Sequence, residues 1–334
     1  MEPDSWQAVL PPMLLGVGID PGSRLVVEPL TGGVSSDIVR VETASGRVFC
    51  AKRALPKLKV KADWEAPLER NHYEVAWLRR ASAISPGSAP AVIAEDRARG
   101  IALLDYLPPE DFALWKSELL AGRADPSIAG RVATVLGTIH RATLNDATAA
   151  AEFPTDDLID ALRLDPYLRF TAGRHPALSA HILKVVETTA RTKMALVHGD
   201  VSPKNILIAK ADGHPVLLDA ETAWYGDPAF DAAFLLNHLM LKSIHLPQLN
   251  TELMRLAGVF SDLWLGHFPA DLRAGLEARV AALLPCLMLA RVDGKSPVEY
   301  LVPATQQRVR DIAMPLIATP VPRLAEVFAK VRPA

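Results

Sequence analysis

The chain has 334 residues, of which 50% are hydrophobic and 22% are charged, and its formal net charge is −2. This balance is typical of globular proteins and excludes a disordered or fibrous chain. The near-neutral charge also excludes the strongly basic surface that is typical of nucleic-acid binders. Only two cysteines occur, without a Cys-x-x-Cys spacing, which argues against a disulfide framework or a thiolate zinc site.

The N-terminal segment begins MEPDSW and has early acidic residues, a pattern unlike that of a signal peptide. Its prolines indicate that residues 1–24 form an extension that packs on the domain that follows. The longest apolar stretch, about Val280 to Ala290, is interrupted by Pro285 and is shorter than the roughly 20 residues of a membrane span. We therefore expect a soluble, cytoplasmic protein that binds neither membrane nor nucleic acid.

Strand-like segments dominate residues 25–107, which we expect to form a small antiparallel-sheet lobe. Residues 25–30 are rich in β-forming residues, two strands are expected around a turn at Ser45-Gly46, and residues 91–107 return to strand character. Between them, Leu68, Val75 and Leu78 indicate a helix over residues 62–80.

The pattern becomes helical after Pro108-Pro109. Apolar residues from Ile128 to Ile139 lie on one helical face, and a second helix is expected around residues 178–186. A short hairpin interrupts the helices, with a turn at Asp212-Gly213. The sequence thus predicts an α+β protein with two lobes, the sheet lobe at 25–107 and a larger helical lobe at 108–334.

The segment LVHGDVSPKNILI, residues 196–208, contains polar residues that suit phosphoryl transfer. That reaction needs one carboxylate to orient an acceptor hydroxyl, and an amide and a second carboxylate to hold magnesium. Asp200, Asn205 and Asp219 fit these needs, because the predicted hairpin brings residues 205 and 219 side by side. Each of the three could alone be a turn or cap residue; their combination favours a kinase.

The sheet lobe contains two features that suit binding of a nucleotide. The glycine-containing turn at residues 31–36 would let backbone amides approach phosphate oxygens, although a Gly-Gly hairpin turn is the alternative. Lys52 lies in an apolar strand, where burial is costly without an anionic partner. Glu74 and Glu69 are the candidates, and we favour Glu74 because it shares a helical face with Leu78.

Together these motifs resemble the aminoglycoside phosphotransferase family, the small-molecule branch of the protein-kinase-like superfamily. The resemblance covers residues 25–240 in the family's order. It is carried by the segments TGGVSSD, CAKRAL, LLDYLP, LGTIHRATL, HGDVSPKNILI, LLDAE and YGDPAFDAAFLL. It implies a two-lobed protein-kinase-like fold. Methylthioribose, choline and homoserine kinases also belong to the family, so the resemblance does not identify the acceptor.

The resemblance also implies roles for individual residues. Asp200 would be the catalytic base, Asn205 and Asp219 would bind Mg²⁺, and Lys52, held by Glu74, would bind the phosphates of ATP. The further residues that it assigns are the phosphate-covering Gly33, Val34, Ser35 and Ser36, the adenine-reading hinge Asp105, Tyr106 and Leu107, and the structural residues His198 and Asp231.

This sequence departs from the protein-kinase pattern at two places. Asp219-Ala220-Glu221 stands where protein kinases have Asp-Phe-Gly, and the glycine turn lacks the Gly-x-Gly-x-x-Gly form, so GTP stays open as an alternative donor to ATP. Only eleven residues separate Asp219 from Asp231, too few for a peptide-docking loop, which favours a small-molecule acceptor.

The acceptor pocket is expected in the helical lobe. Glu221 could approach a metal or a substrate hydroxyl, and Trp224 and Tyr225 could form a wall of the pocket, with simple packing as the alternative for the aromatic pair. Polar residues within apolar helices that could line it are His238, Lys242, Arg291 and Asp293. We expect an ATP- and Mg²⁺-dependent phosphotransferase that acts on a hydroxyl of a small molecule. The alternatives are a nucleotide-binding regulatory pseudokinase and a protein kinase.

Overall fold

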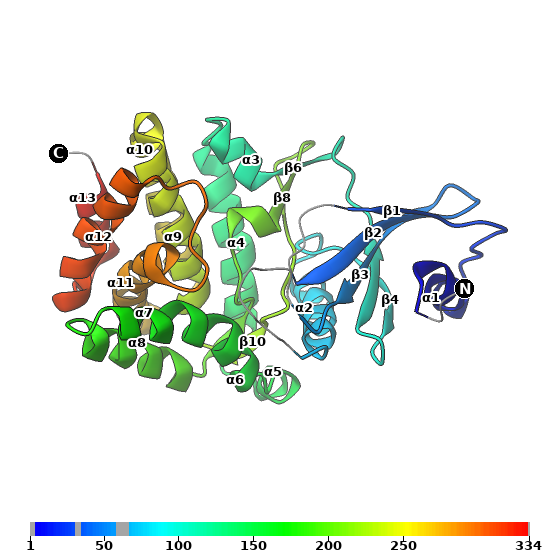
Figure 1. Ribbon diagram of the computed structural model, residues 1–334, viewed down its shortest axis with the longest axis horizontal. Coiled ribbons are helices and arrows are strands. Elements are labelled where there is room, and N and C mark those ends of the chain that lie inside the picture. Colours follow the sequence, from blue (N-terminus) through cyan, green and yellow to red (C-terminus); the bar gives the residue numbers. More distant parts are fainter. Residues whose placement is uncertain (1–3, 31–34, 58–66, 333–334) are drawn as a thin grey trace. The chain divides into compact units, whose positions relative to one another are not determined.

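The structure, a computed structural model, describes residues 4–30, 35–57 and 67–332 (Figure 1). It divides into two compact units, Met1–Phe112 and Ala113–Ala334, called unit 1 and unit 2 below. Unit 1 is built on an antiparallel sheet and unit 2 is mostly helical. The α+β class that the sequence predicts is therefore confirmed.

Unit 1 contains a five-stranded antiparallel sheet with the strand order β1-β2-β3-β5-β4. The first three strands follow one another along the chain, and the last two form a hairpin whose second strand lies beside β3. The strands are β1 (Val26–Pro29), β2 (Ser36–Glu42), β3 (Val48–Ala54), β4 (Val92–Asp96) and β5 (Ile101–Asp105). Gly46, with φ of 80°, supplies the left-handed residue of the turn between β2 and β3. As a result β3 is an inner strand, bonded to neighbours on both edges.

Alternation along β3 separates the two faces of the sheet. Phe49 and Ala51 belong to a buried cluster on one face, whereas Lys52 points to the other face. Helix α2 (Arg70–Ile84) supplies Glu74 to that second face. The helix begins later and ends later than the sequence predicts; residues 62–66 of the expected helix lie outside the described residues.

Helix α1 (Trp6–Gly16) covers the first face of the sheet, although its prolines suggested only an extension over residues 1–24. The helix contains Pro11 and Pro12, and it packs because Val9, Leu10 and Leu14 are buried in the same cluster as Phe49 and Ala51. Hydrophobic burial thus overrides the weak helix propensity of this segment.

We predict that Leu10→Ala destabilises unit 1 by about 2–5 kcal/mol, because the side chain is 0% exposed and leaves a cavity. Leu15→Ala, in the same helix but 61% exposed, is the matched control and should change stability by no more than about 0.5 kcal/mol. Hydrogen–deuterium exchange of the β2 and β3 amides measures both effects. Equal exchange in the two variants would contradict the packing of α1 on the sheet.

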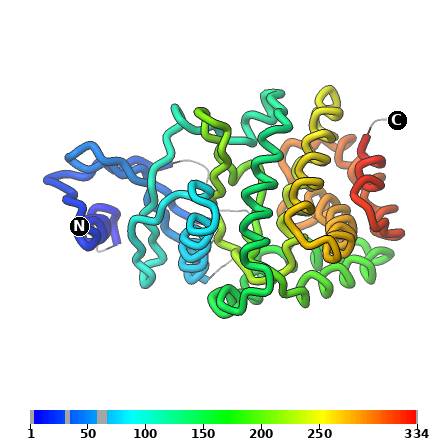
Figure 2. The backbone as a smooth tube through the Cα atoms, turned by 180° about the vertical axis from the view of Figure 1, so that it is seen from behind, coloured from blue at the N-terminus to red at the C-terminus, as the bar shows by residue number. Residues whose placement is uncertain are grey.

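Unit 2 is dominated by helices, several of which lie side by side towards the C-terminus (Figure 2). Helix α9 packs against α10 and α11, and α11 also packs against α12. The helices are α3 (Trp115–Leu120), α4 (Pro126–Ala142), α5 (Ala147–Glu152), α6 (Asp156–Ile159), α7 (Phe170–Arg174), α8 (Ser179–Arg191), α9 (Ala229–His245), α10 (Asn250–Gly266), α11 (Ala270–Asp293), α12 (Pro303–Ala318) and α13 (Leu324–Val331). A π-helical segment, η1 (Asp160–Arg169), joins α6 to α7, and short 3₁₀ turns lie at Pro203–Asn205 and Pro247–Leu249.

Two small sheets hold the loop that carries the predicted motif. Strand β7 (Ala195–Val197) pairs with β10 (Trp224–Gly226), and β8 (Ile206–Ala209) forms a hairpin with β9 (Pro215–Leu217). Strand β6 (Phe112–Leu114) lies beside β8. The hairpin agrees with the sequence-based expectation, whereas β10, made of Trp224 and Tyr225 with Gly226, was not expected. The loop from His198 to Asn205 therefore connects the two sheets.

No helix in the parts of the chain that the structure describes is both long and apolar enough to cross a membrane. The 24-residue helix α11 contains Pro285 and has charged residues at both ends.

Candidate functional site

The loop after β7 is fixed by a buried carboxylate in the first turn of α9. Asp231 accepts hydrogen bonds from the backbone amides of His198 and Gly199, each at 2.8 Å. Its Oδ2 also lies 3.1 Å from Nε2 of His140, whose Nδ1 accepts from the indole of Trp264 at 3.0 Å. Because Nδ1 is an acceptor, Nε2 carries the ring proton and donates it to Asp231. A chain of buried hydrogen bonds thus sets the position of the loop.

His198 connects the loop to the hairpin that follows it. Its Nδ1 accepts from the Asp200 amide at 3.2 Å, so Nε2 carries the proton and donates to the carbonyl of Leu218 at 3.0 Å. Burial lowers the pKa of His198, although nearby carboxylates oppose the shift. The neutral ring therefore acts as a brace between the loop and the end of β9. A second link joins these segments, from the Leu218 amide to the carbonyl of Asn205 at 2.9 Å.

The carboxylate of Asp200 is held through one of its two oxygens. Oδ2 accepts from Nδ2 of Asn205 at 2.9 Å, and it lies 3.1 Å from Arg163 and 3.2 Å from Lys204. Within the described residues, Oδ1 makes no hydrogen bond. The side chain is thus oriented by three donors on one oxygen, and the other oxygen is left to bind a further group.

Arg163 and Lys204 are site residues that the sequence reasoning missed. Arg163 lies on η1, is buried, and also donates to the carbonyl of Gly199 at 2.8 Å. Burial alone would lower its pKa, but the charge of Asp200 and of other nearby carboxylates raises it. Nothing in the sequence DALRLDPYLR marks this arginine.

Lys204 could have been found from its position four residues after Asp200. Its side chain is 47% exposed, and the charge of Asp200 raises its pKa, with a further contribution from Asp219. It therefore lies next to two carboxylates and still reaches solvent. A cation in this position suits the neutralisation of phosphate oxygens.

Asp219 follows β9 with an unusual backbone conformation. Its φ of 66° lies in the left-handed region, which residues other than glycine rarely adopt and which is found often at functional sites. The charges of Asp219 and of the buried Glu221 both act on Arg163, together with that of Asp200. The charges of three carboxylates therefore act on one arginine.

The residues present fit a magnesium ion that is bound partly by protein oxygens and partly by phosphate oxygens. Within the described residues, no three His, Cys, Asp or Glu side chains are placed to hold a metal by themselves. Mg²⁺ in phosphoryl-transfer sites instead binds one or two protein oxygens plus phosphate oxygens. Asn205 donates through Nδ2, which leaves its carbonyl oxygen as a candidate ligand, and Asp219 supplies a carboxylate.

In unit 1, Lys52 and Glu74 form a buried ion pair. Nζ lies 2.8 Å from each carboxylate oxygen, and both side chains are less than one-tenth exposed. Of the two carboxylates considered from the sequence, Glu74 is the one in contact, while Glu69 precedes α2. An ion pair in this setting keeps the lysine extended across the face of the sheet.

Arg70 is a further residue that the sequence reasoning missed. It is fully buried and donates to the backbone carbonyls of Ser35, Leu55 and Pro67, at 2.7, 2.6 and 2.8 Å. It thereby ties together the start of β2, the end of β3 and the segment before α2. Ser35 and Ser36 are both buried, and Ser36 Oγ has no partner among the described residues. Gly33 and Val34 lie outside the described residues.

The predicted hinge lies at the end of β5. Asp105 is exposed and its amide donates to the carbonyl of Ala91 at 2.9 Å. Tyr106 lies beneath the guanidinium of Arg40, 5.7 Å from the ring centre, and Leu107 is half-buried. The backbone after Asp105 has no regular structure and leads to the boundary between the units.

The predicted acceptor residues lie in two places in unit 2. Trp224 and Tyr225 lie in β10, where the indole donates to Asp156 at 2.6 Å and the phenol donates to the carbonyl of Met194 at 3.1 Å. His238 packs on Phe234 in α9. In α11, Arg291 donates hydrogen bonds to the backbone carbonyl and the hydroxyl of Ser296, and it lies 3.3 Å from the hydroxyl of Tyr167. Asp293, at the end of the same helix, accepts hydrogen bonds from His175 and Arg310.

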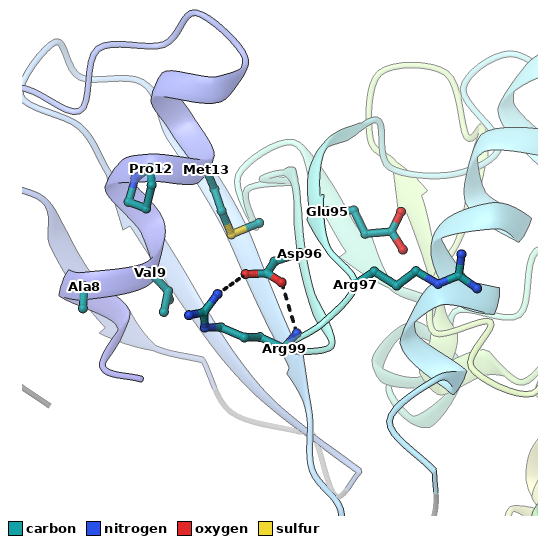
Figure 3. Close-up of a pocket in the computed structure, with 8 residues that line it drawn as sticks. All are labelled: Ala8, Val9, Pro12, Met13, Glu95, Asp96, Arg97 and Arg99. Atoms are coloured by element: carbon teal, nitrogen blue, oxygen red, sulfur yellow. Dashed lines mark hydrogen bonds and ion pairs between the residues drawn. The ribbon is translucent and has the colours of Figure 1, made fainter. Parts of the chain in front are cut away.

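A hollow of about 390 Å³ lies elsewhere, between α1 and the turn that joins β4 to β5 (Figure 3). Asp96 and Arg99 form an ion pair at 2.8 Å at its edge. None of the residues that the motifs assign line this hollow.

We predict that Gly199→Ala destabilises unit 2 by at least about 2 kcal/mol. Gly199 has a φ of 80°, and an added Cβ would lie 2.4 Å from the carbonyl oxygen of Thr222. Gly258→Ala, in the interior of α10 with open space around the position, is the control and should stabilise by about 0.5–1 kcal/mol. Urea denaturation of both variants measures the difference. If both substitutions shift the midpoint in the same direction, the tight loop described above is wrong.

An antiparallel-sheet unit with a buried lysine–glutamate pair, followed by a helical unit with a braced carboxylate loop, defines a protein of the kinase-like class. The model of the APH phosphotransferase enzyme family matches residues 26–263, most of the chain, so the chain belongs to this family. The resemblance found in its motifs is therefore confirmed.

Individual relatives are identical to this chain at only about a quarter of the aligned positions. A methylthioribose kinase from Yersinia enterocolitica is 25% identical over 258 residues, which cover 69% of this chain and 63% of that enzyme. A methylthioribose kinase from Bacillus pumilus is 25% identical over 222 residues, 58% of this chain and 54% of that enzyme. The chain thus spans less than two thirds of the length of these relatives.

Two solved structures share the fold. An ethanolamine kinase from Plasmodium vivax has a TM-score of 0.56 at 13% identity, over 89% of this chain and 84% of the other. An amicoumacin kinase in complex with AMP-PNP, Ca²⁺ and Ami also has a TM-score of 0.56, at 12% identity, over 89% of this chain and 90% of the other. The predicted kinase-like fold is thereby confirmed.

Proposed function

We propose that the protein transfers the γ-phosphate of ATP to a hydroxyl group of a small molecule, with Mg²⁺ as the metal. The observation that carries this proposal is the environment of Asp200. One carboxylate oxygen is held by Asn205, Arg163 and Lys204, and the other makes no hydrogen bond within the described residues. A carboxylate held in this way is suited to orient an acceptor hydroxyl.

In this proposal Asp200 accepts the proton of the acceptor hydroxyl at Oδ1. As the proton leaves, the acceptor oxygen bonds to the γ-phosphorus, and the bond from that phosphorus to the ADP oxygen breaks. Lys204, which is half-exposed and adjacent to Asp200, neutralises negative charge on the transferred group. Arg163 holds Asp200 in place, because it pairs with the carboxylate and with the loop backbone.

Magnesium would be held by Asn205 and Asp219 together with phosphate oxygens, and when bound it would neutralise the charge of the phosphates. The left-handed conformation of Asp219 is the kind of backbone strain that persists where a side chain must point in a set direction.

The nucleotide would be bound by unit 1. Lys52, extended by its ion pair with Glu74, suits contact with phosphates, and Ser35 and Ser36 with the preceding glycine turn would cover them. Asp105 to Leu107 would read adenine through backbone groups. All the residues that phosphoryl transfer needs are present, and no observation favours the pseudokinase alternative. The family membership and the methylthioribose kinase relatives support this proposal.

The direct experiment is a screen for acceptor-dependent ADP formation with purified protein, ATP and Mg²⁺. The acceptors are aminoglycosides, sugars, thiosugars and amino alcohols, and a peptide library is the comparison. We expect one small-molecule class to stimulate ADP formation. Phosphorylation of peptides at comparable rates would contradict the proposal.

We predict that Asp200→Asn lowers turnover by roughly 10²–10⁴-fold while nucleotide binding stays near normal, because an amide cannot accept the proton of the acceptor. Asp262→Asn, at an exposed position of α10, is the control for the same chemical change. Steady-state kinetics with the best acceptor, together with ATP binding by calorimetry, measures both quantities. An unchanged turnover number in Asp200→Asn would show that Asp200 is not the group that accepts the proton.

We predict that Lys52→Met weakens binding of ATP with Mg²⁺ by roughly tenfold or more, since a charge-assisted contact to phosphate is lost. The readout is the increase in melting temperature that ATP produces in each protein, because the substitution also removes the partner of Glu74 and lowers the starting stability. Lys184→Met, at an exposed position of α8, is the matched control. An equal increase in all three proteins would show that Lys52 does not bind phosphate.

A further inference from the structure

Two buried basic side chains lie along α9, whose first turn holds the loop after β7. His238 and Lys242 are seven and eleven residues after Asp231, so all three lie on one face of the helix. Arg291 of α11 and Tyr300, in the segment after α11, complete this group, which we call the cationic cluster.

Lys242 is the most unusual member of the cationic cluster. The residue is only 2% exposed, and its ammonium lies 5.5 Å from the ring centre of Tyr300. No carboxylate pairs with it anywhere in residues 4–30, 35–57 and 67–332. Buried lysines are almost always paired, since an isolated buried charge is strongly unfavourable.

The residues around Lys242 add further positive charge next to it. Burial, followed by the charges of Lys116 and Arg291, lowers the pKa of Lys242 to about 7. Burial also lowers the pKa of His238 well below its usual value, and Lys242 and Arg291 lower it further. Within the described residues, no carboxylate forms an ion pair with Lys242 or Arg291, so the cationic cluster keeps a positive charge.

The cationic cluster also contains hydrogen-bond donors without acceptors. Within the described residues, Nε of Arg291 and the hydroxyl of Tyr300 are buried and have no partner. Buried polar groups are satisfied in most proteins, so two orphaned donors beside an unpaired ammonium point to a ligand that accepts hydrogen bonds.

The cationic cluster connects to Asp200 through residues of unit 2 alone. Arg291 lies 3.3 Å from the hydroxyl of Tyr167, and the guanidinium of Arg163 lies 5.9 Å from the ring centre of Tyr167. Arg163 in turn pairs with Asp200. A small molecule with its hydroxyl at Asp200 therefore has the cationic cluster within reach of its other end.

We propose that the cationic cluster binds an anionic group of the acceptor, so that the substrate is a sugar or polyol that carries a carboxylate or a phosphate. The anion supplies the missing partner of Lys242 and accepts from Arg291 and Tyr300. A polycationic acceptor, such as an aminoglycoside, is repelled by the same residues. This inference rests on the proposed function and specifies its substrate class.

The experiment measures acceptor binding by calorimetry with the full chain and without ATP. The ligand panel contains matched neutral, carboxylate and phosphate forms of three-, five- and six-carbon sugars or polyols. In the wild type we expect an anionic member to bind at least about tenfold more tightly than its neutral counterpart. Lys242→Met should remove this preference, and Lys184→Met should keep it. Comparing the affinities of the carboxylate and phosphate forms shows which of the two anions the cationic cluster prefers.

The inference is overturned if no anionic member binds more tightly than its neutral form, or if Lys242→Met keeps the preference. Acceptor-dependent ADP formation is measured separately on the same panel. If the anionic preference holds but no member is phosphorylated, the cationic cluster stands and the kinase proposal falls. If only neutral or cationic members are phosphorylated, the kinase proposal stands and this inference falls.

A second measurement uses the protein without any ligand. At pH 6, Lys242→Met should raise the melting temperature by about 2–4 °C, because it removes an unpaired buried charge. This difference in melting temperature should shrink towards pH 9. Because the pKa of Lys242 in the folded wild type is about 7, the side chain is mostly neutral at pH 9. The folded wild type then no longer contains a buried unpaired charge, and its stability rises with pH. The groups around Lys242 that carry or could change charge are Lys116, His238, His245, Arg291, Glu299 and Tyr300. A lower melting temperature of Lys242→Met at pH 6 would show that the ammonium is satisfied within the protein and would overturn the inference.

Discussion

The carboxylate of Asp231 fixes the backbone on which the candidate site depends. It accepts from two consecutive amides of the loop after β7 and from the ring of His140, all in buried surroundings. In such surroundings an unsatisfied amide or an unpaired carboxylate is strongly unfavourable, so the interaction is both strong and specific in geometry. With His198 and Gly199 held, the direction of Asp200 and the start of the turn to Asn205 follow. The first turn of α9 therefore also holds the loop in position.

Charge is distributed unevenly beyond that loop. On one side, the charges of Asp200, Asp219 and Glu221 act on Arg163, and Lys204 pairs with Asp200 as well. Three carboxylates therefore oppose two cations where a metal and phosphates would bind. On the other side, Lys242 is buried and Arg291 is half-buried, and no described carboxylate pairs with either of them. Each imbalance destabilises the ligand-free protein, and each is relieved by a ligand of the opposite sign.

Unit 1 illustrates how a small sheet can position a single cation. Lys52 lies on an inner strand, with apolar residues of the same strand packed against α1 on the opposite face. Glu74 gives the ammonium a fixed partner, and Arg70 ties three segments of backbone around it. The hydrophobic cluster beneath α1 and the ion pair beside α2 thus stabilise the two faces of one sheet by different means.

The sequence by itself determined the features that depend on local pattern and on spacing. Segments rich in β-forming residues, with a turn at Ser45-Gly46, predicted strands in unit 1, and helical periodicity predicted α4 and α8. The interval from His198 to Asp219 identified the loop and hairpin with its polar residues. The pairing of Lys52 with Glu74 could be inferred because an apolar strand leaves a lysine in need of a partner, and the helix periodicity favoured one of two glutamates.

Only the tertiary structure decided which distant residues meet. Arg163 and Arg70 have no periodic or motif signal, because they bind backbone carbonyls and carboxylates far away in the chain. The pairing of β10 with β7 and the packing of α1, despite its two prolines, depend on burial against segments that are remote in sequence. The sequence marked Lys242 as a polar residue in an apolar helix. That it lacks a counter-charge follows from the positions of all its neighbours, since a charge is paired or unpaired through three-dimensional proximity, which local sequence does not specify.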